Sequence, residues 1–94
     1  MQASDVEKYP IALSHLQTAA AGGHFEAGRK LADAHYLGQL GLDRDYARAL
    51  AHYQQLKANA DSDRFGWQLD TTGSDYQYLV NHIRQMQKMI GQAG

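Results

Sequence analysis

The sequence predicts an all-α fold of stacked antiparallel helix hairpins, with one further amphipathic helix packed at the C-terminal end. Three observations lead to this prediction: an internal repeat, apolar residues at helical three-and-four spacing, and glycines at the points where helices end. The chain has 94 residues, of which 44% are hydrophobic and 20% charged, as is ordinary for a globular protein. Residues 1–94 are therefore expected to form a single domain.

The repeat is found by comparing the sequence with itself. The segment YPIALSHLQ, which begins at Tyr9, matches YARALAHYQ, which begins at Tyr46, 37 residues later along the chain. Tyr, Ala, Leu, His and Gln recur at equivalent positions, and Leu16 is matched by the aromatic Tyr53. A period of this size is typical of helical-hairpin repeats that stack into solenoids.

Proline and glycine bound the first two helices. The first is expected to begin near Pro10, because a first helical turn tolerates proline, and to end at the glycine pair 22–23. The second runs from about His24 to Leu37. Gly38 ends this second helix, because glycine readily takes the left-handed conformation.

The third helix follows a glycine-rich turn. It spans about Asp45 to Ala58, and either Asp43 or Asp45 caps its first turn. Gly38 and Gly41 permit the sharp reversal before it, because glycine tolerates positive φ. Alanines at positions 32 and 49 predict a close approach of the second and third helices.

The last helix is an amphipathic capping helix over residues 74–91. It begins at Ser74, where Ser-Asp-Tyr-Gln fits a capping box, and it frays at Gly91 and Gly94. Its apolar stripe consists of Tyr76, Leu79, Val80, Ile83, Met86, Met89 and Ile90.

Residues 59–73 form an irregular connector that contains the single tryptophan. Phe65, Trp67 and Leu69 alternate with polar residues and glycine as in an extended segment, yet Phe65 and Leu69 also suit one helical turn. The interpretation favoured here is a short irregular helix followed by a Thr-Thr-Gly loop.

A longer motif covers the middle of the chain. Residues 27–53 read A-x-x-x-L-A-x-x-H-x-x-G-x-x-G-L-x-x-D-Y-x-x-A-L-x-H-Y, which resembles the Sel-one-like repeat, a relative of the tetratricopeptide repeat. Residues 12–27 resemble the closing half of a preceding repeat, so about 1.5 repeats cover residues 9–58. The chain departs from the family pattern at His15, Ala32, His35 and His52, and its glycine loop is one residue longer.

The resemblance implies a non-catalytic protein–protein interaction module, a scaffold or adaptor that binds a peptide or protein on its helical repeat surface. In tetratricopeptide geometry, the second helix supplies groove residues from positions that do not touch the third helix. These would be Glu26, Arg29, Asp33 and Tyr36, and an ordinary solvated face is the alternative. Trp67 is a further candidate contact, because tryptophan is enriched in interface hot spots, although a lone tryptophan more often fills a small core.

Other classes of function receive no support from the sequence. There is no cysteine, no His-x-x-x-His pair and no recognisable nucleophile elbow, so we expect no catalytic residues, no metal site and no cofactor. Aspartates fall mainly at expected helix starts, where they cap. The net charge is -1 without a basic stripe, which argues against nucleic acid, and no apolar run is long enough to span a membrane.

The alternative function is self-association as a homodimer. Either the stripe of residues 76–90 or the open edge formed by Ile11, Leu13 and Leu16 would provide the contact. The first residues lack the pattern of a signal peptide, so a soluble cytoplasmic protein is the default expectation. A periplasmic or secreted location is expected instead if the chain is part of a longer protein.

Overall fold

A computed structural model describes residues 3–93 of the chain, and side chains within residues 10–91. Over this range the chain forms α1 (Ala3–Ala21), α2 (Phe25–Leu37), α3 (Tyr46–Asp61) and α4 (Ser74–Ala93), without a β-strand. The prediction of an all-α fold is confirmed. Among the described residues, no helix combines the length and apolar character that crossing a bilayer requires.

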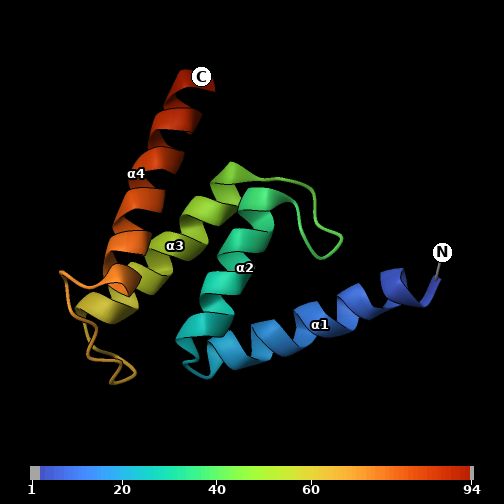
Figure 1. The fold of residues 1–94 in the computed structure, drawn as a ribbon, viewed down its shortest axis with the longest axis horizontal. Coiled ribbons are helices and arrows are strands. Elements are labelled where there is room, and N and C mark those ends of the chain that lie inside the picture. Colours follow the sequence, from blue (N-terminus) through green and yellow to red (C-terminus); the bar gives the residue numbers. More distant parts are fainter. Residues whose placement is uncertain (1–2, 94) are drawn as a thin grey trace.

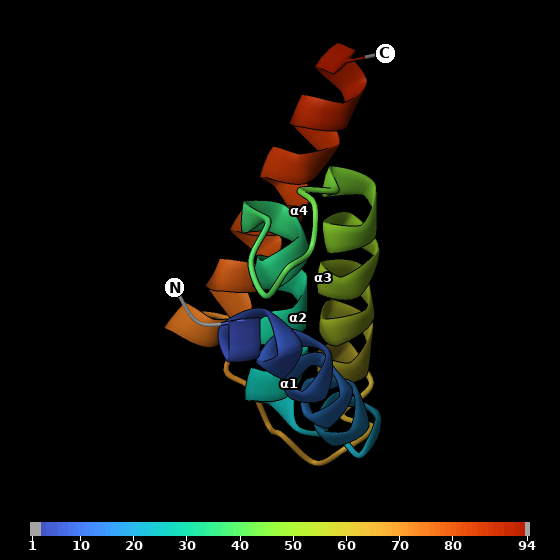
Figure 2. The ribbon, with the colours of Figure 1, turned by 90° about the vertical axis from the view of Figure 1, so that its right-hand side faces the viewer.

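The helices pack in chain order. α2, α3 and α4 run up, down and up, so each is antiparallel to the next, and α3 packs against both α2 and α4 (Figure 1). α1 packs against α2 at a steep angle, and its first turns extend away from the other helices. Seen from the side, α2 and α3 lie next to each other while the last turns of α4 project beyond them (Figure 2).

Local chemistry sets the turn between α2 and α3 as expected. Gly38 takes the left-handed conformation with φ of 70°, and its N–H donates to the carbonyl of Ala34. Gly41 also has a positive φ, of 77°. The carboxylate of Asp45 caps α3 by accepting a hydrogen bond from the backbone N–H of Arg48 at 3.1 Å. Asp45, rather than residue 43, is therefore the cap.

Two predicted helix boundaries are wrong, the start of the first helix and the end of the third. α1 begins at Ala3, so Pro10 lies inside the helix and not in its first turn. A proline inside a helix removes one backbone hydrogen bond. Its ring fixes φ at a helical value, however, so the helix can continue on both sides of it. α3 extends to Asp61 because i,i+4 pairs hold its last turns: Lys57 with Asp61 at 2.9 Å, and a hydrogen bond between residues 55 and 59.

The capping box at the start of α4 is not formed. Ser74 is the first helical residue, and the carbonyl of Gly73 accepts from the N–H of Gln77 at 3.0 Å. The Gln77 side chain donates to the carbonyl of Thr71 at 2.7 Å. At the other end the helix continues through Gly91 to Ala93, while the predicted end at Gly94 lies outside the described residues.

The connector between α3 and α4 contains turns and extended backbone, and the short helix favoured from the sequence is absent from residues 62–73. Asp63, Gly66 and Gln68 have positive φ, which a right-handed helix does not allow. Residues 65, 67 and 69 are half-buried and the residues between them are exposed, so the alternating pattern was the correct interpretation.

The core is formed where α3 meets its two neighbours. Small side chains allow α2 and α3 to approach closely, and Ala32 and Ala49 are fully buried, as predicted. A Cβ built on Gly28 would lie only 2.6 Å from Cδ2 of Leu56, so this seam has no spare room. The buried hydrophobic residues are Ala27, Leu31, Ala32, Ala34, Ala49, Tyr53, Leu56, Leu79 and Met86.

Candidate functional site

The four groove residues predicted on α2 lie on the side of the helix that approaches α4. Arg29 pairs with Glu26 at 3.5 Å, and the side chain of Glu26 is 69% exposed. The guanidinium carbon of Arg29 lies 5.3 Å from the centre of the Tyr78 ring, a cation–π contact that spans from α2 to α4. We call the surface formed by Glu26, Arg29, Asp33, Tyr36, Tyr78 and His82 the α2–α4 face.

Asp33 is the central polar group of this face. Its carboxylate accepts hydrogen bonds from the hydroxyls of Tyr78, at 2.7 Å, and of Tyr53. Because Tyr53 belongs to α3, the expectation that Asp33 lies away from the third helix is wrong. Burial raises the pKa of Tyr53 well above its usual range, and the neighbouring Asp33 carboxylate raises it further. Burial also raises the pKa of Tyr78, again assisted by Asp33.

Tyr36 is held in place by aromatic contacts. Its ring meets that of His82 edge-on, with centroids 5.6 Å apart, and lies 5.9 Å from the ring of Tyr46. His82 in turn stacks on Tyr78 at 4.0 Å. Tyr78 and His82 were not predicted from the sequence as members of this face, although their i,i+4 spacing on one helix was a usable signal.

Trp67 lies apart from the α2–α4 face. Its indole N–H donates to the carbonyl of Gly23 at 2.6 Å, and its ring packs against Phe25 and Phe65 at centroid distances of 5.2 and 5.5 Å. Gly23 has a φ of 96°, and a Cβ there would lie 2.5 Å from the Phe65 ring. Trp67 thus joins the connector to the α1–α2 turn, the packing role given above as the alternative to an interface contact.

A groove of about 640 Å³ separates α1 from α2 and the turn that follows α2. Its α1 wall contains small and apolar side chains, and its α2 wall contributes one positive and one negative charge. Ile11, beside the groove, is 60% exposed, while Leu13 and Leu16 are half-buried. We call this feature the α1–α2 groove; it is lined by Ala12, His15, Leu16, Ala19, Lys30, Asp33, Gln39 and Leu40.

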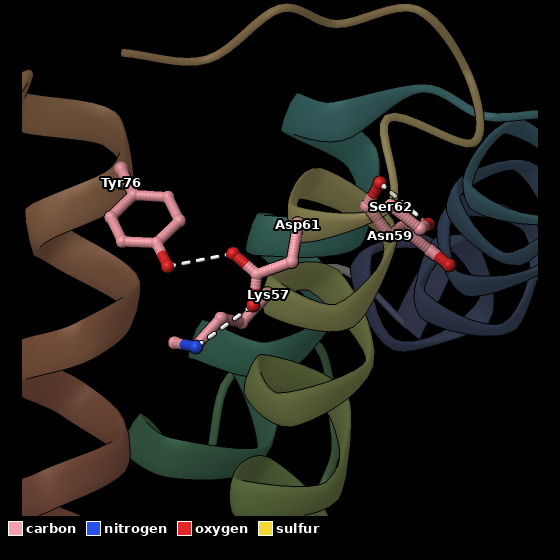
Figure 3. Close-up of polar contacts among 5 residues, drawn as sticks. All are labelled: Lys57, Asn59, Asp61, Ser62 and Tyr76. Atoms are coloured by element: carbon pink, nitrogen blue, oxygen red, sulfur yellow. Dashed lines mark hydrogen bonds and ion pairs between the residues drawn. The ribbon is translucent and has the colours of Figure 1, made fainter. Parts of the chain in front are cut away.

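A polar cluster ties the end of α3 to the start of α4. The hydroxyl of Tyr76 donates to one oxygen of Asp61 at 2.7 Å, and Lys57 pairs with the other at 2.9 Å (Figure 3). The Tyr76 and Lys57 hydrogen bonds lower the pKa of Asp61. Ser62 donates to the carbonyl of Asn59 nearby at 3.3 Å. This arrangement fixes α4 on α3 through charge-assisted hydrogen bonds.

The second dimerisation surface considered from the sequence, the α4 stripe, lies largely against α3. Leu79 and Met86 are fully buried in the core, and Ile83 and Met89 pack on it. Among residues with described side chains, no three His, Asp or Glu side chains gather closely enough to hold a metal ion.

Comparison of the chain with protein-family models, with curated proteins and with solved structures finds no match. The resemblance to the Sel-one-like repeat remains a prediction that depends on the motif alone.

Proposed function

We propose that the chain is a non-catalytic protein–protein interaction module, a scaffold or adaptor in which about 1.5 Sel-one-like repeats form a fragment of a tetratricopeptide-like superhelix. The motif over residues 9–58 and the antiparallel order of α2, α3 and α4 support this proposal. Stacked helical repeats bind partners on a concave surface, and we assign that surface to the side shared by α2 and α4.

The single observation that carries the proposal is the preorganised α2–α4 face. Asp33 fixes the hydroxyls of two tyrosines, and the Tyr78 ring holds the Arg29 guanidinium. Because these side chains are already ordered, the face itself would lose little side-chain entropy when it binds a partner segment. Glu26 remains exposed beside them, so the face offers acidic and basic side chains around tyrosine rings and suits a polar peptide.

Capture of proteins from native lysate tests the α2–α4 face. The immobilised chain is compared with Arg29→Glu, and with Arg84→Glu as the matched control, since Arg84 is exposed on α4 and outside this face. We expect a protein that binds the wild type and Arg84→Glu but is reduced at least tenfold with Arg29→Glu, as judged by quantitative mass spectrometry. Equal capture by all three chains, each with unchanged helicity and melting, would contradict the proposal.

A further inference from the structure

The α1–α2 groove lies beside α1 where, one repeat later along the chain, α2 lies beside α3. With the 37-residue offset, the four groove residues on α1 correspond to four residues on the inner side of α3. Ala12 corresponds to Ala49, His15 to His52, Leu16 to Tyr53 and Ala19 to Leu56.

On α3, these four residues lie along the seam with α2, and the Tyr53 ring also packs against Tyr78 and His82 of α4. Ala49 and Tyr53 are fully buried and Leu56 is 6% exposed. The ring of His52 stacks on His35 of α2, with centroids 5.0 Å apart. The equivalent side of α1 therefore has the shape of a helix-packing surface, and the volume next to it is open.

The helix that covers α3 has two properties that an occupant of the groove should share. α2 runs antiparallel to α3, and its contact side carries small residues, Gly28 and Ala32 among them. An occupant of the groove should likewise be an antiparallel helix whose small residues allow close approach.

α1 itself satisfies both conditions. Its groove positions 12, 15, 16 and 19 are symmetric about the midpoint between His15 and Leu16. In an antiparallel pair of α1 helices, Ala12 of one copy meets Ala19 of the other, and His15 meets Leu16. Residues 10–21 contain no Asp, Glu, Lys or Arg, so two copies of this surface meet without like-charge repulsion.

We propose that a second copy of this chain fills the groove, with the two α1 helices packed antiparallel about a two-fold axis. Ile11, which is 60% exposed, lies at the edge of the paired surface and loses part of its contact with water. The paired segment of 12 residues is about 18 Å long, which gives less than the roughly 800 Å² per partner of a standard interface. The dimer is therefore weak, with a dissociation constant of roughly 1 µM to 1 mM, and it leaves Arg29 and Tyr78 available for a different partner.

Sedimentation equilibrium from about 1 µM to 1 mM tests the dimer. The wild-type mass should rise with concentration from 10.5 kDa toward twice that value. Ala12→Lys and Ala19→Glu should each raise the dissociation constant at least tenfold, because each places a charge at a small-to-small contact. An equimolar mixture of the two variants should dimerise again, since an antiparallel pair brings the introduced ammonium and carboxylate together.

Two further variants keep the result interpretable. Ser14→Lys places the same charge on the exposed opposite side of α1, and it should leave the dimer unchanged. Ile11→Lys alters an exposed side chain and should weaken the dimer without loss of helicity. A wild type that stays at 10.5 kDa up to 1 mM overturns the proposal and leaves the groove to a helix of another protein. An equimolar mixture of Ala12→Lys and Ala19→Glu that stays monomeric also overturns it. The α2–α4 face is tested separately, by the capture experiment with Arg29→Glu.

Discussion

α1 and α3 are two copies of one helix in different surroundings. Both present Ala, His, a large side chain and a further apolar residue at the same spacing. On α3 this surface is covered by α2 and, at Tyr53, by α4 as well, and Tyr53 is fully buried. On α1 the equivalent Leu16 is half-buried beside an open groove. The comparison shows that burial depends on which helix lies next to a surface, and not on the pattern of that surface alone.

The difference separates two roles for the same type of surface. Side chains on the covered seam of α3 lose contact with water when the monomer folds, and they stabilise it in proportion to the apolar area that they bury. Side chains in the α1–α2 groove keep part of that contact, so their remaining apolar area is available for association. Substitutions on α3 should therefore lower the free energy of unfolding, and substitutions at the equivalent positions of α1 should mainly weaken association.

The largest expected effect is at the center of the covered seam. Tyr53→Ala removes a fully buried ring and should lower the free energy of unfolding by about 3–5 kcal/mol. Leu16→Ala, at the equivalent half-buried position, should lower it by only about 1 kcal/mol. Urea unfolding followed by circular dichroism measures both values, at a concentration that keeps the chain monomeric.

Tyr53→Phe is the control for this pair. It keeps the ring and removes only the hydroxyl that donates to Asp33, so the expected loss is about 1 kcal/mol. Equal losses for Tyr53→Ala and Leu16→Ala would show that the two surfaces are equally buried, and the contrast between α1 and α3 would be wrong.

A smaller effect is expected where α2 comes closest to α3. Gly28→Ala should lower the free energy of unfolding by about 1 kcal/mol, because the added methyl group meets Leu56 inside a buried seam. This loss exceeds the gain in helix propensity that alanine brings. Gly91→Ala, on an exposed part of α4 with nothing within 4 Å, should instead be neutral or stabilising. If urea unfolding shows that Gly28→Ala and Gly91→Ala both raise the free energy of unfolding, the seam between α2 and α3 has room for a methyl group.

Features set by nearby residues could be predicted from the sequence. Gly38 ends α2 and Asp45 caps α3 because each acts within four residues along the chain. The burial of Ala32 and Ala49 could also be predicted, since small residues in helical register indicate close packing. The true start of α1 could not, because Pro10 is compatible with both a first turn and a helix interior.

The chemistry of the α2–α4 face depends on distant residues. Asp33 was identified as a surface carboxylate, but its partners Tyr53 and Tyr78 lie 20 and 45 residues further along the chain. Helical spacing tells which residues share one side of a helix, and it does not tell which neighbouring helix that side meets. For the same reason, Trp67 could be assigned either to an interface or to a small core until its contact with Gly23 was known.

The smallest expected effect is a pH dependence of stability that arises from the two histidines stacked between α2 and α3. Burial lowers the pKa of His52 and of the stacked His35, and the positive charge of Arg48 lowers both further. Below about pH 6.5, the unfolded chain then binds more protons than the folded chain. The free energy of unfolding therefore has its full value above that pH and decreases as the pH falls. The melting temperature should decline between pH 7.5 and pH 5, and His52→Gln should make that decline shallower. His15→Gln, at the equivalent exposed position of α1, is the matched variant, and a larger change from His15→Gln than from His52→Gln would contradict the assignment to the stacked pair.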